Sequence, residues 1–352
     1  MSAGGRRAVG ALAGTVTLLL VPVVAALTLP RLHEPWTGRE VELAALTPWG
    51  LPASGLLVVV ALATTACARR WWRLLPGFIA AAGVLTLATH AVWLAPFFSG
   101  DPPTGSTGQA GQSDRLVVMT QNLEYGSAAS LVDLVRANAV DVLVLVDLTP
   151  DGRSAVIASD LPARLPFTVG ADGGSLVLSR YRLGADRLIS GGGDSRELTV
   201  ETPMMGAVDL VALHPTPPYQ GGAWRHDYGE ILGRLRESGR VRPDRPRVVA
   251  GDLNATADHV ALQQVLSLGY RDAVEQADAG WQPTFPAPGA VRRLGLPVPP
   301  LVQIDHVLVS AGLRAHDVHR VAVAGADHLG VVAVVTPATG DAGTATGTPP
   351  LG

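Results

Sequence analysis

The 352-residue sequence contains no lysine, so all 27 of its basic residues are arginines. Cysteine is almost absent as well, because the single Cys67 lies in an apolar stretch and has no partner for an intrachain disulfide. A disulfide-stabilised scaffold is therefore excluded, whereas one thiol neither favours nor excludes an oxidising compartment. The lack of lysine indicates a coding bias typical of GC-rich genomes and carries no functional information.

The sequence also lacks a basic face. From position 114 to 336 it has 20 arginines against 25 acidic residues, a net charge of −5. Proteins that bind nucleic acid non-specifically gain most of their affinity by neutralising phosphates with basic side chains. The composition therefore disfavours nucleic acid as the partner of this segment, without removing a nuclease from consideration.

Long apolar runs, by contrast, are frequent in the first hundred residues. Three of them occupy about residues 8–29, 49–68 and 74–96. Each has about 20 residues, enough for a helix to cross the hydrocarbon core of a bilayer, and aromatic residues lie near their ends. We predict a membrane anchor over residues 1–98 with three transmembrane helices. A cleavable signal peptide is the alternative for the first run only.

The placement of arginine predicts how the anchor is oriented. Arg6 and Arg7 precede the first run, and Arg69, Arg70 and Arg73 lie between the second and the third. Both groups fall on the same side after two crossings, and by the positive-inside tendency that side is cytoplasmic. The sequence therefore predicts a multi-pass protein of the cell membrane whose remaining chain is extracytoplasmic.

Two segments of low complexity bound the rest of the chain. Residues 99–113 (SGDPPTGSTGQAGQS) are predicted to form a flexible linker, which keeps the following domain close to the bilayer. Residues 338–352 have a similar composition and are predicted to form a disordered tail. A folded domain is therefore predicted over residues 114–337.

Within that domain, apolar runs rich in β-branched residues alternate with segments of helical spacing. The strand-like runs are 115–120, 142–146, 175–179, 207–213, 247–250, 304–309 and 331–335, and the helix-like segments are 130–137 and 228–237. This alternation predicts an α/β fold. Several of the strands end directly in polar residues, which is a usual place for a site on such a scaffold.

The polar residues at these strand ends carry the chemistry that phosphoester hydrolysis requires. Such a reaction needs a hard cation, a base for water and donors for the phosphoryl oxygens. Carboxylate and carboxamide oxygens suit Mg²⁺ or Mn²⁺. The oxygen donors are Asn122, Glu124, Asp147, Asp252, Asn254 and Asp327.

Histidine supplies the candidate base. His328 could take a proton, with Asp305 accepting from its other ring nitrogen and fixing the tautomer. Each element alone has a simpler reading, because Asp-x-Asn also occurs in turns and a lone histidine after a strand is often a surface residue. The occurrence of all these residues in this order along the chain is a more specific signal than any one of them.

In that order, the motifs resemble the endonuclease/exonuclease/phosphatase superfamily. The most specific pieces are GDLN at 251–254 and the Asp-His pair at 327–328, and the resemblance covers residues 115–336. It implies a four-layer α/β sandwich, in which two packed mixed sheets have helices outside, and a metal-dependent phosphoester hydrolase. Three spans followed by such a domain also resemble a membrane branch associated with glycopeptide-antibiotic resistance.

The resemblance also implies a role for each polar residue. The side chains implied to hold Mg²⁺ or Mn²⁺ are Asn122, Glu124, Asp147 and Asp327. The side chains implied to act on water and phosphate are His214, Asp252, Asn254, Asp305 and His328. One departure stands out, because relatives typically have Gln-Glu where this chain has Val146-Asp147. The carboxylate is one methylene shorter, so the metal must lie closer to the strand or be bridged by water.

Three hypotheses for function follow. The first is a membrane-tethered phosphatase or phosphodiesterase that acts on a phosphoester at the outer leaflet, with a lipid-linked phosphate as one candidate substrate. The second is an extracytoplasmic nuclease, and the third is a non-catalytic membrane sensor or scaffold.

Overall fold

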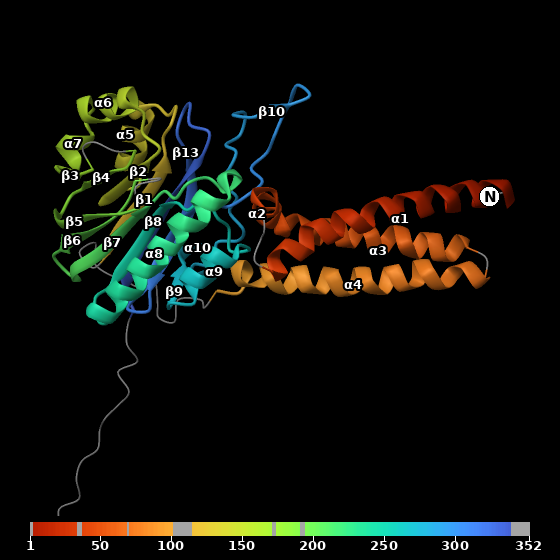
Figure 1. Ribbon diagram of the computed structural model, residues 1–352. Coiled ribbons are helices and arrows are strands. Elements are labelled where there is room, and N and C mark those ends of the chain that lie inside the picture. The colour runs from red at the N-terminus through yellow and green to blue at the C-terminus, as the bar shows by residue number, and fades with distance from the viewer. Residues whose placement is uncertain are drawn as a thin grey trace, which may run out of the picture.

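The computed structural model describes residues 3–33, 37–68, 70–100, 115–170, 174–190 and 194–338. The predicted linker from residue 101 and the predicted tail from residue 339 lie outside the described residues. The described chain consists of a helical bundle and an α/β domain, and the bundle extends from one end of that domain (Figure 1).

The bundle consists of three long helices, α1 (Ala3–Leu32), α3 (Gly50–Cys67) and α4 (Leu74–Leu94). Their apolar spans, Ala8–Leu32, Thr47–Cys67 and Trp71–Phe98, are long and apolar enough to cross a membrane. The three predicted apolar helices are therefore confirmed. The first turns of α1 lie at the end of the bundle away from the α/β domain (Figure 1).

Short helices connect the bundle to the rest of the chain. They are α2 (Gly38–Ala45), η1 (Thr47–Trp49), η2 (Arg70–Arg73) and η3 (Ala95–Phe98). The amphipathic helix α2 begins at a capping box, in which Thr37 and Glu40 satisfy each other's backbone N–H groups. Because of this cap, α2 forms as a separate helix between the first two spans.

The first sheet has the strand order β13-β14-β1-β2-β4-β3, and only the β1–β2 pair is parallel. Its strands are β1 (Leu116–Asn122), β2 (Val142–Val146), β3 (Phe167–Val169), β4 (Leu176–Ser179), β13 (Leu313–Ala322) and β14 (Leu329–Pro337). The helices α5 (Ala128–Ala137), α6 (Pro150–Ala158) and α7 (Leu161–Arg164) are associated with this sheet. The sheet is therefore mixed, as predicted.

The second sheet has the order β5-β6-β7-β8-β12-β9, and its one parallel pair is β7–β8. Its strands are β5 (Arg182–Ser190), β6 (Ser195–Thr202), β7 (Gly206–Leu213), β8 (Arg247–Asp252), β9 (Tyr270–Asp272) and β12 (Asp305–Ser310). The accompanying helices are η4 (Pro218–Gln220), α8 (Gly222–Val241), α9 (Val260–Leu266) and α10 (Ala273–Gln276). A separate two-stranded hairpin pairs β10 (Arg292–Arg293) with β11 (Leu296–Pro297).

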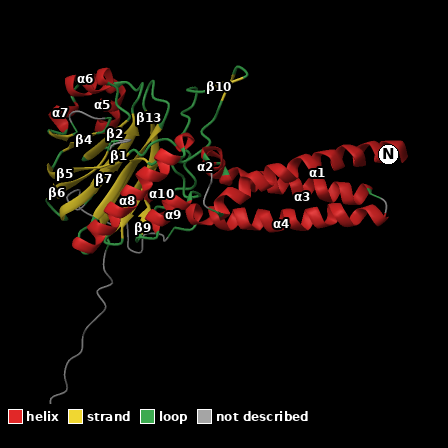
Figure 2. Ribbon diagram, viewed as in Figure 1, coloured by secondary structure: helices red, strands yellow, loops and turns green. Residues whose placement is uncertain are grey.

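The two sheets pack face to face and the helices lie outside them (Figure 2). The central core joins valines of the first sheet, such as Val118 and Val144, to Leu210, Val248 and Val307 of the second. Because these strands are buried on both faces, they are continuous Val/Leu runs that can be recognised in the sequence. The predicted four-layer α/β sandwich is confirmed.

Candidate active site

The candidate site begins at the carboxyl ends of β1 and β2. These strands are parallel and in register from Val118↔Val142 to Asn122↔Val146, so Asn122 and Asp147 emerge side by side. The Asn122 amide Nδ2 lies 3.4 Å from a carboxylate oxygen of Asp147. Asp147 has φ 56°, a left-handed conformation that aspartate tolerates better than most residues.

The second sheet contributes Asp252 from the end of β8. Asn122 Nδ2 donates to Asp252 Oδ2 at 3.2 Å, which joins the ends of the two sheets. A Cβ on the preceding Gly251 would lie 1.9 Å from the Leu213 carbonyl oxygen, so only glycine fits there. The glycine of the GDLN motif thus allows β7 and β8 to approach closely and places Asp252 at the site.

The turn after β8 holds Asn254. Asp252 Oδ1 accepts from the Asn254 backbone N–H at 2.8 Å, and the Asn254 amide donates to the Pro215 carbonyl at 2.9 Å. Asn254 has φ 46°. Asp252 and Asn254 therefore form the turn that an Asp-x-Asn sequence often adopts. The same turn brings Asn254 beside the segment that follows His214.

The hydrogen bond predicted between Asp305 and His328 is confirmed. His328 Nδ1 lies 2.9 Å from Asp305 Oδ2 and 3.8 Å from Asp252 Oδ2. Asp305 and Asp252 are direct partners across the antiparallel β12–β8 pair. Like charges placed opposite each other in a sheet repel, and the imidazole between them offsets that repulsion when it is protonated.

The charge of His328 follows from its surroundings. Burial alone lowers the pKa of a histidine, but the carboxylates of Asp305, Asp252 and Asp327 outweigh it and raise the pKa of His328 to about 10. The imidazole is therefore positively charged at neutral pH in this arrangement. The ring of Phe285 covers it, with ring centroids 4.7 Å apart.

The three remaining predicted residues surround this centre. Glu124 lies two residues beyond β1, and its backbone N–H donates to Asn122 Oδ1 at 3.3 Å. Asp327 directly precedes His328, and His214 directly follows β7, whose last residue pairs with Gly251. All three are half-buried. Position 214 is therefore next to the end of β8.

The donor set fits a hard divalent cation. Asn122 and Asp147 lie side by side, and the Asp327 Oδ1 atom is buried without a hydrogen-bond partner. Next to them, polar atoms of Asp252, Asp305 and His328 lie within 4.8 Å of one another, so the negative charge of this end is concentrated in a small volume. Rotating the Asn122 amide by half a turn would aim its oxygen at the carboxylates that its nitrogen now contacts. Oxygen ligands of this kind suit Mg²⁺ or Mn²⁺ better than softer metals.

Sequence reasoning did not identify several residues that hold the site together. Gln121 donates to the carbonyl oxygens of Asn122 and His328, which ties the end of β1 to the Asp-His pair. His306 lies on the opposite face of β12 from Asp305 and contacts Asp272 at 2.7 Å and the Ala255 carbonyl at 3.0 Å. No short motif marks these contacts, since they join residues far apart in the chain.

His259 connects the same turn to the bundle. Its Nδ1 accepts from the Thr256 N–H at 2.8 Å, so its Nε2 carries the proton that is donated to the Val41 carbonyl of α2 at 2.7 Å. Both ring nitrogens are therefore engaged by backbone groups. This histidine supports the turn that bears Asn254, and the contact with α2 makes the bundle part of that support.

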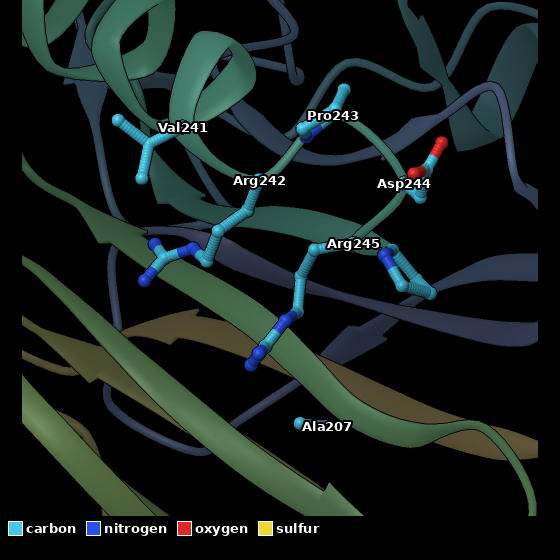
Figure 3. A pocket seen from close by; sticks show the side chains of 7 residues that line it. Ala207, Val241, Arg242, Pro243, Asp244 and Arg245 are labelled. Atoms are coloured by element: carbon cyan, nitrogen blue, oxygen red, sulfur yellow. The ribbon is translucent and has the colours of Figure 1, made fainter.

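A shallow hollow of about 480 Å³ lies at the other end of β7 and β8 (Figure 3). Its lining includes Arg242, Arg245 and Ala207. Both arginines pair with the buried Asp209, at 3.0 Å and 3.6 Å. Because these charges compensate one another and lie at the strand ends opposite to Asp252, the hollow is not the catalytic site.

Comparisons with known proteins agree with this geometry. Residues 119–328 match the model of the Endonuclease/Exonuclease/phosphatase family. No curated protein matches the sequence.

Solved structures show the same fold. An endonuclease/exonuclease/phosphatase from Beutenbergia cavernae is 23% identical with a TM-score of 0.50, and the match covers 64% of this chain and 72% of that one. One from Bacteroides vulgatus is 16% identical with a TM-score of 0.50, over 64% of this chain and 99% of that one. The family model covers more than half of the sequence and ends at the Asp-His pair. The chain therefore belongs to the endonuclease/exonuclease/phosphatase family.

Proposed function

We propose that this chain is a membrane-anchored, Mg²⁺- or Mn²⁺-dependent phosphoester hydrolase whose catalytic domain is extracytoplasmic. The observation that carries the proposal is the convergence of Asn122, Asp147, Asp252, Asp305 and His328 where the ends of the two sheets meet. Members of this family hydrolyse phosphoester bonds. The residues present are those that this chemistry needs.

The metal ligands we propose are Asn122, Glu124, Asp147 and Asp327. Asn122 and Asp147 lie 3.4 Å apart at the ends of adjacent strands, and Asp327 has a buried oxygen without a partner. A hard divalent cation would neutralise charge that develops on the phosphoryl oxygens. Asp147 replaces a longer glutamate, so we place the ion close to the end of β2.

The remaining residues act on water and phosphate. Asp305 holds His328 through Nδ1, which leaves Nε2 to donate to a phosphoryl oxygen. Asp252 is then the base that orients water and takes its proton. Asn254 and His214 are assigned to contacts with the phosphate, because the turn after β8 and the end of β7 meet there.

The substrate class we favour is a phosphoester of a membrane lipid. The catalytic segment has a net charge of −5 and so lacks the basic surface that nucleic-acid backbones require. The same end of the domain contacts the bundle: the Trp49 indole donates to the Leu301 carbonyl at 2.9 Å, and Arg31 forms an ion pair with Asp258. A site fixed beside the bundle is close to lipid.

A screen of the full chain in lipid nanodiscs tests the activity. Candidate substrates are phosphatidate, sphingomyelin, a soluble phosphomonoester, a soluble phosphodiester and duplex DNA, each with Mg²⁺, Mn²⁺ or EDTA. We expect metal-dependent hydrolysis of a phosphoester, with the lipid substrates preferred. Hydrolysis of DNA alone would favour the nuclease alternative, and no hydrolysis of any of these by the folded protein would favour a scaffold.

The full chain is required because α2, which lies between the first two spans, shares a core with the domain. Val41 of α2 is completely buried within the cluster formed by α8, α9 and the second sheet. We retain residues 1–98 as the anchor, 99–113 as a linker, 114–337 as the catalytic domain and 338–352 as a tail. Cutting between the anchor and the domain would expose the surface that Val41 covers.

The orientation is tested by reporter fusions after Pro96. We expect an alkaline phosphatase fused there to be active and a cytoplasmic reporter to be inactive, because arginines precede the first span and lie between the second and third. The reverse pattern would place the catalytic domain in the cytoplasm and remove the extracytoplasmic part of the proposal, while leaving the hydrolase activity to be judged by the nanodisc screen.

A further inference from the structure

The hairpin β10–β11 is the most exposed apolar projection of the α/β domain among the described residues. Leu294 and Leu296 at its tip are 102% and 71% exposed. The segment from 283 to 302 contains two arginines, Arg292 and Arg293, and no acidic residue. Arg292 donates to the Gly295 carbonyl at 2.7 Å within the hairpin, so the turn presents two leucines and two positive charges together. An exposed apolar patch with a polar rim is typical of a surface that contacts a protein or a membrane.

The backbone conformation of the turn does not favour a leucine at position 294. Leu294 has φ 50° and Gly295 has φ 78°, so both central residues of this two-residue turn lie in the left-handed region. Asparagine or aspartate followed by glycine is the usual choice for such a turn, because leucine is disfavoured at positive φ. Local backbone preference therefore does not explain why a leucine stands at the tip.

The base of the hairpin belongs to the wall of the active site. The ring of Phe285 packs against His328, and the Ala287 N–H donates to the Asp327 carbonyl at 2.6 Å. On the returning segment, the Leu301 carbonyl accepts from the Trp49 indole, at the start of the second span. The hairpin thus connects the site to the domain-side end of the bundle.

The hairpin also projects in the direction that a membrane contact requires. Its tip extends past the domain toward the side on which α1, α3 and α4 lie (Figure 1). Trp49 lies at the domain-side end of the bundle, where an aromatic ring is favoured at a membrane interface. The tip therefore extends from the level of that interface.

We propose that the tip of this hairpin, residues 292–296, docks on the lipid surface of the same membrane that the three helices cross. Leu294 and Leu296 enter the headgroup region and the upper acyl chains, and Arg292 and Arg293 meet anionic lipid headgroups. This inference rests on the membrane anchoring in the proposed function. It adds that a lipid phosphoester reaches the site along the hairpin.

A depth measurement tests this without relying on activity. In the full chain with Cys67→Ser, an environment-sensitive NBD label is attached to Leu294→Cys, and the protein is placed in nanodiscs whose lipids carry a nitroxide in the headgroup or in the mid-acyl chain. Leu85→Cys in α4, 70% exposed, is the membrane control, and Met204→Cys, 52% exposed at the far end of the domain, is the water control.

We expect the label at 294 to be quenched most strongly by the headgroup nitroxide, at least fivefold more than the label at 204, and the label at 85 by the acyl nitroxide. If 294 is no more quenched than 204 while 85 is quenched, the hairpin lies in water and the inference is wrong. A blue-shifted but unquenched label at 294 means that protein covers the tip, which also overturns it. If 85 is unquenched, the anchoring itself fails.

A second variant connects the contact to the site. The pair Leu294→Ser and Leu296→Ser should raise KM for vesicle-borne phosphatidate at least fivefold, leave kcat unchanged, and leave hydrolysis of a soluble phosphoester unaltered. Equal effects on both substrates would show that the tip acts through the fold of the site instead of through lipid. No effect on either substrate would show that the tip plays no part in delivering lipid.

Discussion

Buried carboxylates at the two ends of the second sheet have different partners. At one end, Asp209 lies within 3.0–3.6 Å of Arg242, Arg245 and Arg247. At the other end, Asp252 and Asp305 face each other across β8 and β12 with His328 as their shared partner. Among the described residues, no arginine forms an ion pair with Asp252 or Asp305.

This difference distinguishes a structural ion network from a candidate catalytic site. A buried carboxylate is costly unless it is paired, so the three arginines around Asp209 are what a structural ion network requires. The acidic cluster at the catalytic end has more negative charge than His328 can balance, and a divalent cation would supply the remainder. The hollow of about 480 Å³ beside Arg242 and Arg245 lies at the arginine-paired end, away from the acidic cluster.

The largest effect is expected from the same substitution made at the two ends. Asp252→Asn should reduce kcat by roughly 10²–10⁴-fold, the usual value of a positioned base, with little change in thermal stability. Asp209→Asn should leave kcat nearly unchanged but lower the midpoint of thermal inactivation by roughly 5–10 °C, because it unbalances a buried network. Both are measured on the full chain in nanodiscs.

Exposed Asp244→Asn, beside the same arginines, is the control and should change neither quantity. If Asp209→Asn abolished turnover as Asp252→Asn does, without loss of folded protein, the division into a structural and a catalytic end would be wrong.

The next effect concerns the shortened carboxylate at the end of β2. Asp147→Ala should raise the Mg²⁺ concentration required for half-maximal activity by roughly tenfold or more, since a ligand is lost. Asp147→Glu restores the carboxylate and should retain most of the activity. A titration of activity against Mg²⁺ measures both, and an alanine variant with the wild-type titration curve would remove Asp147 from the metal site.

A third, smaller effect tests the support that the bundle gives to the catalytic end. Burial lowers the pKa of His259 to about 4, so its ring is neutral in the folded protein. The contribution of His259 to the free energy of unfolding is therefore fully present above pH 6.5. It decreases by on the order of 3 kcal/mol as the pH falls toward 4, because the unfolded chain takes up a proton first. A His259→Gln variant should be less stable at pH 7.5 and lose less between pH 7 and pH 5.

Thermal inactivation of the full chain across that pH range is the measurement. His226→Gln, an exposed histidine on α8, is the matched control and should follow the wild type. A His259→Gln profile parallel to the wild type would show that this ring does not hold the turn to α2 in the way the contacts indicate.

The smallest effect is expected at Glu275, in α10 near the bundle. Burial, and next the charge of Asp272, raise the pKa of Glu275 to about 7. Ionisation of the folded protein is thus disfavoured, and stability decreases as the pH rises from about 4.5 to 7. Glu275→Gln should raise the midpoint of thermal inactivation by a few degrees at pH 8 and leave it unchanged at pH 4.

Most of the central strands could be predicted from the sequence because they are buried on both faces. The run 142–146 is the observed β2, and 207–213 differs from β7 by one residue. By contrast, β5 and β6 were not predicted, since sequences such as RLGADRLIS lack an apolar pattern. Their charges are satisfied only in the folded sheet, where Arg196 pairs with Asp186 and Asp194.

The same reasoning explains what was predictable about the site. Residues that belong to motifs of the family, such as Asp305 and His328, could be identified, and the hydrogen bond between these two could be predicted. His306 and His259 could not, because their partners, Asp272 and the Val41 carbonyl, are distant in sequence. The packing of α2 onto the catalytic domain was missed for the same reason, since nothing in a linear pattern indicates which surface an amphipathic helix will cover.

The central claim is that the acidic end holds a catalytic cation and the arginine-paired end does not. The most direct measurement is the anomalous scattering of Mn²⁺ in crystals of the full chain. We predict Mn²⁺ within ligand distance, roughly 2.0–2.3 Å, of oxygens of Asn122 and Asp147, and no Mn²⁺ beside Asp209. Mn²⁺ beside Asp209 instead, or no bound Mn²⁺ at millimolar concentration, would contradict the account.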